Sequence, residues 1–151
     1  MYTKILLPTD GSELATATIR EGIEFAKQIN AKVVALFVAS NYQYPIYIDI
    51  IPPNTPTEEE YQAAMRSYGG AYLDAAKFVA EQASVPFEGL VQFNDSAAKE
   101  IVHTAQEHNC DLIFMGSHGR SGVGSLLLGS TTAKVLSLCN IPVLVHRTKN
   151  H

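Results

Sequence analysis

The sequence predicts an α/β fold, an open five-stranded parallel sheet with helices on both faces. Several apolar runs are continuous rather than alternating, as in strands that are buried on both faces. Segments whose apolar residues recur at steps of three and four lie between these runs, and this spacing is typical of helices. Strand and helix therefore alternate along the 151 residues, which favours parallel strands joined by right-handed helical crossovers.

Five runs of residues are predicted as strands. Four of them are continuously apolar, as a sheet covered on both faces requires. The run at 87–93 is weaker because Glu88 and Gln92 interrupt it, and this strand is expected at an edge of the sheet. In chain order the strands are expected at 4–7, 32–38, 87–93, 112–115 and 141–145.

Four helices are predicted between these strands. Apolar residues recur from Ala15 to Ile29 after an N-terminal cap at Ser12. Thr57 and Glu60 form a capping box that opens a longer second helix. The third helix is marked by Ala98, Ile101 and Ala105, and the short fourth by Thr132, Val135, Leu136 and Cys139.

The second helix has two features of its own. Tyr61, Tyr68 and Tyr72 fall on one stripe, which favours packing in the core or along a groove over contact with a cofactor. Gly69 and Gly70 lie inside the same helix, where each costs about 1 kcal/mol relative to Ala. A kink or a break at this glycine pair is therefore compatible with the sequence.

Composition favours one domain over residues 1–151 and excludes several classes of protein. Apolar residues make up 46% of the chain, enough for one buried core, and the net charge of −4 disfavours binding to nucleic acid. No apolar segment approaches the roughly 18 residues of a membrane span. Cys110 and Cys139, with no secretory leader before them, predict reduced thiols and a cytoplasmic protein.

One connection is much longer than the others. The segment 39–56 follows the second strand directly and contains four prolines and several aromatic residues. Connections of this length are usually functional or mobile. Whether this one closes over a ligand stays open at the level of the sequence.

Polar, turn-forming residues follow the first and fourth strands. The first strand ends in Pro8-Thr9-Asp10, and the fourth runs into a segment rich in glycine and serine that extends to Thr132. In an open parallel sheet, ligands bind beyond the carboxyl ends of strands where the strand order reverses. If these two strands are neighbours, their polar ends form one candidate site.

The glycine-rich segment suits phosphate. Glycines allow backbone amides to approach an anion, and Gly129-Ser130-Thr131 precede a helix whose first amides and dipole favour negative charge. Ser117, Ser130 and Thr131 offer hydroxyl donors, and Arg120 offers a positive charge. The alternative is a glycine-rich surface loop without a ligand, because neither G-x-x-x-x-G-K-[ST] nor G-x-G-x-x-G is present.

Asp10 has two interpretations. It is either a cap or turn residue at a strand-to-helix junction, or a carboxylate that accepts hydrogen bonds from a ribose or a base. Its position at the carboxyl end of a strand is compatible with both.

The chain resembles the universal stress protein family. Gly116, Gly119, Gly129 and Ser130 match that family's spacing G-x₂-G-x₉-G-[ST]. The opening segment 5–12, the segment 111–116 and the closing segment 141–145 are similar to it as well. The resemblance covers essentially the whole chain and implies the strand order 3-2-1-4-5, which places the first and fourth strands side by side.

The resemblance also implies ATP binding, with Mg²⁺ or Mn²⁺ bridging the phosphates rather than held in a protein cage. Adenine and ribose would lie near the first and second strands, and the phosphates near the glycine-rich segment. The expected nucleotide-binding residues are Pro8, Thr9, Asp10, Val38, Met115, Gly116, Ser117, His118, Gly119, Arg120, Gly129, Ser130 and Thr131.

The last strand is expected at an edge of the sheet. Pro142 suits an edge, and a bare apolar edge strand favours association with another chain. The resemblance implies a homodimer that pairs through Ile141, Val143 and Val145. The alternative is that the C-terminal tail covers this strand.

No catalytic set or protein-bound metal site is predicted. Asp10 has no evident second carboxylate for acid–base work, and His103 and His108 are five residues apart, so they do not share a helix face. The leading hypothesis is a nucleotide-dependent stress-response or signalling module with slow or no hydrolysis. An adenine-nucleotide α-hydrolase-like enzyme is the alternative, although its motifs S-G-G-x-D-S and H-x-G-H are absent; a receiver domain using Asp10 and Asp95 is a third.

Overall fold

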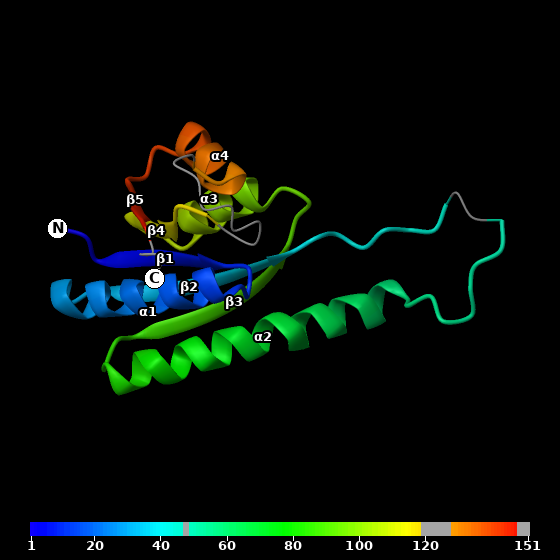
Figure 1. The fold of residues 1–151 in the computed structure, drawn as a ribbon, viewed down its shortest axis with the longest axis horizontal. Helices are drawn as coiled ribbons and strands as arrows, with labels where there is room; N and C mark the ends of the chain where they lie inside the picture. The colour runs from blue at the N-terminus through cyan, green and yellow to red at the C-terminus, as the bar shows by residue number, and fades with distance from the viewer. Residues whose placement is uncertain (47–48, 119–127, 148–151) are drawn as a thin grey trace.

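The computed structural model describes residues 1–46, 49–118 and 128–147. Its five strands form one parallel sheet in the order β3-β2-β1-β4-β5, which confirms the predicted fold and strand order (Figure 1). β3 lies at an edge, as predicted. The elements are β1 (Lys4–Thr9), α1 (Glu13–Ile29), β2 (Lys32–Ala39), α2 (Glu58–Gln82), β3 (Phe87–Phe93), α3 (Ala97–Glu107), β4 (Leu112–Gly116), α4 (Ser130–Leu138) and β5 (Val143–His146).

Alternate residues of the buried strands face opposite layers of helices. Ile5 and Leu7 of β1 pack with α1 and α2 on one face, whereas Leu6 packs with α3 and α4 on the other (Figure 1). All three side chains are essentially inaccessible to solvent. Burial on both faces is the reason that these strands are continuously apolar in sequence.

β5 begins two residues later than predicted. The ladder starts where the Ile113 amide donates to the Pro142 carbonyl at 3.0 Å. Pro142 itself has no amide to donate to β4. The apolar run 141–145 is therefore only partly strand, and before it the Ile141 amide donates to Cys139 Sγ at 3.3 Å.

α2 is a single helix of 25 residues and has no break at Gly69 and Gly70. A Cβ atom on Gly69 would lie 2.5 Å from Phe37 Cδ1, so this glycine permits close packing of α2 on β2. Gly69 therefore serves tertiary contact rather than a kink. Although α2 is long, no helix in the described ranges is apolar enough over a sufficient length to cross a membrane.

Both cysteines carry free thiols, as predicted. Cys110 is buried between the sheet and α3, and this burial raises the pKa of its thiol to about 11. The thiolate, which is the reactive form, is therefore suppressed at neutral pH.

Asp111 joins the starts of β1 and β4. Its carboxylate accepts hydrogen bonds from the Thr3 amide at 2.9 Å, the Thr3 hydroxyl at 3.0 Å and the Lys4 amide at 3.0 Å. Desolvation opposes ionisation, but the hydrogen bonds from Lys4 and Thr3 outweigh it and hold the pKa of this carboxyl below its usual value.

We expect Asp111→Ala to destabilise the protein by about 1–2 kcal/mol at pH 7, because it removes hydrogen bonds to a charged acceptor. The lowered pKa means that this contribution is fully present above the unfolded-state pKa of about 4 and is lost as the pH falls through the folded-state value. Urea unfolding at pH 7 and at acidic pH measures both effects. Asp74→Ala, at an exposed position of α2, is the control and should stay within about 0.5 kcal/mol; an equal loss there would contradict the role of Asp111.

The connection between β2 and α2 forms an arm that extends beyond the sheet, at the right of Figure 1. We use "the arm" for residues 40–46 and 49–57 together with the first turn of α2. The Tyr61 hydroxyl donates to the Ser40 carbonyl at 2.6 Å, and the Tyr42 hydroxyl donates to the Pro56 carbonyl at 2.5 Å. The Tyr42 ring also packs on Tyr61 at a centroid distance of 5.7 Å. These contacts hold the two sides of the arm together.

Candidate functional site

A pocket of about 340 Å³ lies beyond the carboxyl ends of β1, β2 and β4. The strand order reverses between β1 and β4, which is where open α/β sheets place their ligands. The volume lies within the roughly 300–1,000 Å³ of small-molecule sites. The pocket is lined by Pro8, Thr9, Asp10, Ala15, Thr18, Leu36, Val38, Ala97, Ile101, Met115, Gly116, His118, Gly129, Ser130, Thr131 and Thr132.

One wall of the pocket is apolar. Leu36 and Val38 are two residues apart in β2 and therefore project to the same face of the sheet. Ala97 and Ile101, one turn apart at the start of α3, line the pocket from the facing layer. A slot between a strand and a helix with such side chains suits a flat apolar ring.

A tight turn at the end of β1 places Thr9 and Asp10 in the pocket. The Gly11 amide donates to Thr9 Oγ1 at 3.1 Å, and the Ser12 amide donates to Asp10 Oδ1 at 2.9 Å. Gly11 has φ +79°, a conformation that favours glycine, and a Cβ there would lie 2.7 Å from the Tyr72 ring. Asp10 is thus a turn residue that also lines the pocket, and the cap of α1 is Ser12, as predicted.

Among the described residues, none caps the start of α4 with a side chain. The other three helices are capped by the hydroxyls of Ser12, Thr57 and Ser96, whereas the N-cap of α4 is Gly129. The bond from the Ala133 amide to the Gly129 carbonyl is the first of the helix, so the amides of Ser130 and Thr131 precede its internal hydrogen bonding. This end of α4 therefore presents amides and a positive dipole end to the pocket.

Two amides expected to face phosphate are bonded within the protein. The Ser117 amide donates to the His146 carbonyl at 2.9 Å, and the Gly129 amide donates to the Ser117 carbonyl at 2.6 Å. Thr132 Oγ1 donates to the Gly116 carbonyl at 2.8 Å and ties α4 to the end of β4. These two amides are therefore already bonded, whereas the first amides of α4 are not used by these bonds.

Only some of the predicted residues around the end of β4 line the pocket. Met115, Gly116 and His118 line the pocket, whereas Ser117 is buried beside it, with Oγ 3.2 Å from His118 Nδ1. Within the described part of the chain, His118 Nε2 is buried and has no hydrogen-bond partner. Gly119 and Arg120 lie outside the described residues.

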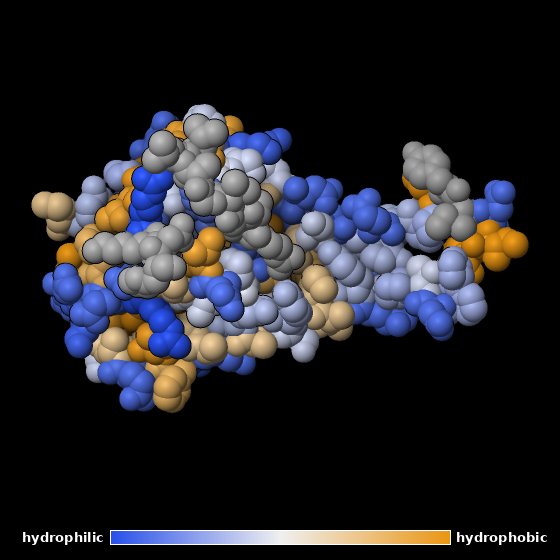
Figure 2. Space-filling model, viewed as in Figure 1, coloured by the Kyte–Doolittle hydropathy of each residue, from blue (hydrophilic) through white to orange (hydrophobic). Residues whose placement is uncertain are grey.

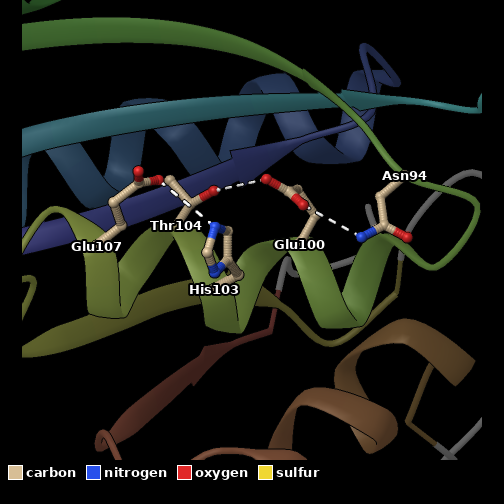
Figure 3. Close-up of polar contacts among 5 residues, drawn as sticks. All are labelled: Asn94, Glu100, His103, Thr104 and Glu107. Carbon is tan, nitrogen blue, oxygen red and sulfur yellow. Dashed lines mark hydrogen bonds and ion pairs between the residues drawn. The ribbon is translucent and has the colours of Figure 1, made fainter.

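A polar network fixes the start of α3 against the pocket. Glu100 accepts hydrogen bonds from Asn94 Nδ2 at 3.1 Å and from the buried Thr104 hydroxyl at 3.3 Å (Figure 3). Asn94 Oδ1 in turn accepts from the amide of Ser96, the cap of α3. Asn94 therefore bonds to both Ser96 and Glu100, and these hydrogen bonds fix the turn that leads into Ala97.

Several lining residues were not predicted from the sequence, namely Ala15, Thr18, Leu36, Ala97 and Ile101, and Thr132 was predicted only as the end of the glycine-rich segment and part of the fourth helix. Ala15, Leu36 and Ile101 belong to apolar patterns, and apolar periodicity does not distinguish a core face from a pocket wall. Leu36 alone carried a usable signal, since it lies two residues before Val38 on the same strand. Asp95 does not line the pocket, and its carboxylate accepts a hydrogen bond from the Asn41 amide at 2.9 Å.

Fold and pocket together define a doubly wound α/β protein with a pocket at its topological switch point. The sequence model of the universal stress protein family matches residues 1–147. The chain belongs to the universal stress protein family.

Two proteins of Methanocaldococcus jannaschii illustrate the relationship. Universal stress protein MJ0531 is 31% identical over 149 residues, covering 96% of this chain and 82% of that protein. The solved structure of MJ0577 is 28% identical with a TM-score of 0.80, covering 100% of this chain and 99% of its own. A family protein of Arabidopsis thaliana, solved with AMP bound, shares the fold at 16% identity and a TM-score of 0.65, covering 97% of this chain and 92% of its own.

Proposed function

We propose that this protein binds an adenine nucleotide, with ATP as the ligand, and acts as a nucleotide-dependent stress-response or signalling module in the cytoplasm. The observation that carries the proposal is the uncapped first turn of α4 in the same pocket as the apolar slot. The phosphates would lie at the first turn of α4, where amides and the helix dipole favour anions. The adenine ring would lie in the apolar slot. A protein of the same fold was solved with AMP.

The end of β1 lies between these two regions of the pocket and suits the ribose. Thr9 and Asp10 both line the pocket. Asp10 Oδ1 is occupied by the Ser12 amide, but a carboxylate has about four acceptor positions in total. Asp10 therefore has the capacity to accept a hydrogen bond from a ribose hydroxyl.

The oxygens in the pocket also fit a divalent cation bridging phosphates. Asp10 is the one carboxylate among the described lining residues, and Thr9, Ser130 and Thr131 add hydroxyls. Mg²⁺ at phosphates uses one or two carboxylates and keeps several waters, so a protein cage is unnecessary. Such an ion, Mg²⁺ or Mn²⁺, would neutralise phosphate charge, and Asp10 would orient it or a water bound to it.

A binding role is favoured over an enzymatic one. In the described pocket Asp10 has no second carboxylate beside it that could share acid–base work, so hydrolysis is expected to be slow or absent. Mass analysis of nucleotide carried through purification tests the proposal. Co-purified intact ATP supports a binding module, whereas nucleotide-free protein with rapid turnover of ATP supports the α-hydrolase-like enzyme.

Substitution of Asp10 tests the ribose contact. We expect Asp10→Ala to weaken adenosine binding by about tenfold, the effect of losing one charge-assisted hydrogen bond, while the protein stays folded. Asp10→Asn retains an acceptor for the Ser12 amide and separates the turn from the ligand contact. Calorimetric titration with adenosine gives both dissociation constants, and an unchanged value in Asp10→Ala argues against the ribose role.

We also propose that two copies pair through β5. The carbonyls of Pro142 and His146 accept hydrogen bonds from β4, so the backbone groups of Val143 and Val145, in the alternate positions, point away from β4 toward the sheet edge. An apolar edge strand of this kind is suited to pairing with its own copy across a two-fold axis. Ile141 is half-buried and flanks this edge.

A proline on the outward side of β5 tests the pairing. Val145→Pro removes an outward-facing amide while the β4 side of the strand keeps its hydrogen bonds, so we expect a monomer with a native circular dichroism spectrum. Light scattering across micromolar concentrations measures the mass. A wild-type protein that is monomeric throughout that range would contradict the pairing.

A further inference from the structure

The tip of the arm exposes a cluster of large hydrophobic residues. Ile46 is 73% exposed, Ile50 is 82% exposed and Ile51 is 58% exposed, and Tyr44 lies beside them at 60%. Hydrophobic colour gathers at the far end of the arm in Figure 2. We use "the tip patch" for these four residues. A concentration of this kind, far from the core, is typical of an interaction surface.

Contacts within the arm hold the tip patch in a defined conformation. The Tyr42 ring packs edge-on against Tyr44 at a centroid distance of 5.1 Å, and the Tyr44 hydroxyl donates to the Glu58 carboxylate. That hydrogen bond is the main reason that the pKa of Tyr44 is raised. Tyr61 continues the aromatic series to Phe93 of β3, with a centroid distance of 6.3 Å.

The root of the arm is fixed to the body by a hydrogen bond. The backbone amide of Asn41 donates to Asp95, two residues beyond β3, at 2.9 Å. Farther along α2, the Arg66 guanidinium lies over the Phe93 ring, 5.0 Å from its centroid. The Asn41 bond and the Tyr61–Phe93 contact therefore connect the arm to the sheet. A partner bound at the tip would meet a preformed surface, which lowers the entropic cost of association.

The charges on the arm indicate which kind of partner the tip patch fits. Residues 33–65 contain no Lys, Arg or His, whereas Asp49, Glu58, Glu59 and Glu60 are all exposed on the arm. Two arms placed tip to tip would bring these carboxylates together, and an anionic lipid surface would meet the same repulsion. A partner surface with apolar residues bordered by Lys or Arg is complementary both to the apolar tip patch and to the carboxylates of the arm.

We propose that the tip patch is a docking surface for a partner protein that presents an amphipathic segment with an apolar face and basic flanks. The apolar face of the partner segment packs on the isoleucines, and its basic flanks pair with the carboxylates of the arm. The proposal does not depend on nucleotide binding, because none of the tip residues lines the pocket.

Two labelled helical peptides of equal length test the proposal, with the same leucine face and either lysines or glutamates on the polar face. We expect the lysine peptide to bind the full chain, as measured by fluorescence anisotropy, and the glutamate peptide to bind at least about tenfold more weakly. Ile50→Asn/Ile51→Asn should weaken the lysine peptide by about tenfold or more, because two exposed aliphatic anchors are lost. Asp49→Asn/Glu59→Gln should weaken it and reduce its dependence on salt.

Phe78→Asn is the matched control, because Phe78 is 63% exposed on α2 but lies outside the arm. This variant should bind the lysine peptide as the wild type does. Equal loss in Phe78→Asn, or no loss in Ile50→Asn/Ile51→Asn, would overturn the proposal and leave only attraction to an acidic protein. It would also be overturned if the isoleucine variant lowered the oligomeric mass by light scattering, or if wild-type protein bound neutral phosphatidylcholine vesicles through these residues.

Discussion

Gly129→Val should weaken ATP binding by about 10- to 100-fold, because it places a side chain at the N-cap of α4 where phosphate is proposed to lie. Gly129 lines the pocket and has φ −60° and ψ 154°, values that valine also adopts. Backbone strain is therefore absent, and the loss would report interference with the ligand. Calorimetric titration with ATP measures it.

Two controls separate a phosphate effect from general damage to the pocket. Adenosine lacks phosphates, so its affinity should change much less than that of ATP in Gly129→Val. Ala133→Val adds the same side chain bulk at an exposed position of α4 and should leave both affinities unchanged. Equal ATP affinities in wild type and Gly129→Val would remove the phosphate role of this helix end.

Gly69→Val should destabilise the protein by about 3 kcal/mol, which corresponds to a fall in Tm of roughly 6–12 °C for a chain of this length. A Cβ there would lie 2.5 Å from Phe37 Cδ1 and 2.8 Å from Phe37 Cγ. Phe37 is buried, and the Tyr68 and Tyr72 rings hold it from two sides, so it has little room to move. Thermal and urea unfolding measure the loss.

The neighbouring glycine supplies the control. A Cβ on Gly70 meets no atom within 4 Å, and valine is a slightly better helix former than glycine. Gly70→Val should therefore stay within about 0.5 kcal/mol of wild type. Similar losses in both variants would show that helix propensity, rather than packing on Phe37, governs this part of α2.

Most of the fold could be predicted from periodicity. Strands that are buried on both faces are continuously apolar in sequence, and helices that are buried along one stripe have apolar residues at steps of three and four. The β5 boundary was wrong because Pro142 has no amide to donate to β4, so the strand starts at Val143 rather than at Ile141. The tyrosine stripe of α2 was predicted as core or groove, and Tyr68 and Tyr72 pack on Phe37 of β2. Their neighbours in space could not be named without the register of helix and strand.

The pocket was predictable in part. Polar residues after β1 and β4 were assigned to one site, and the structure places Thr9, Asp10, Gly116 and Gly129 around a common pocket. Ala97 and Ile101 were missed, because a helix face that lines a pocket has the same apolar spacing as one that lies in a core. That the Ser117 and Gly129 amides are bonded within the protein also depends on partners far apart in sequence.

The chain by itself determined the alternation of strands and helices, the hydroxyl caps of the first two helices and the glycine-rich approach to α4, because these depend on neighbouring residues. The tertiary structure decided which helix starts open into the pocket, which amides are occupied, and that residues 40–46 and 49–57 extend outward as an arm. Those outcomes depend on contacts between distant segments, whose energies are set by packing and geometry rather than by local spacing.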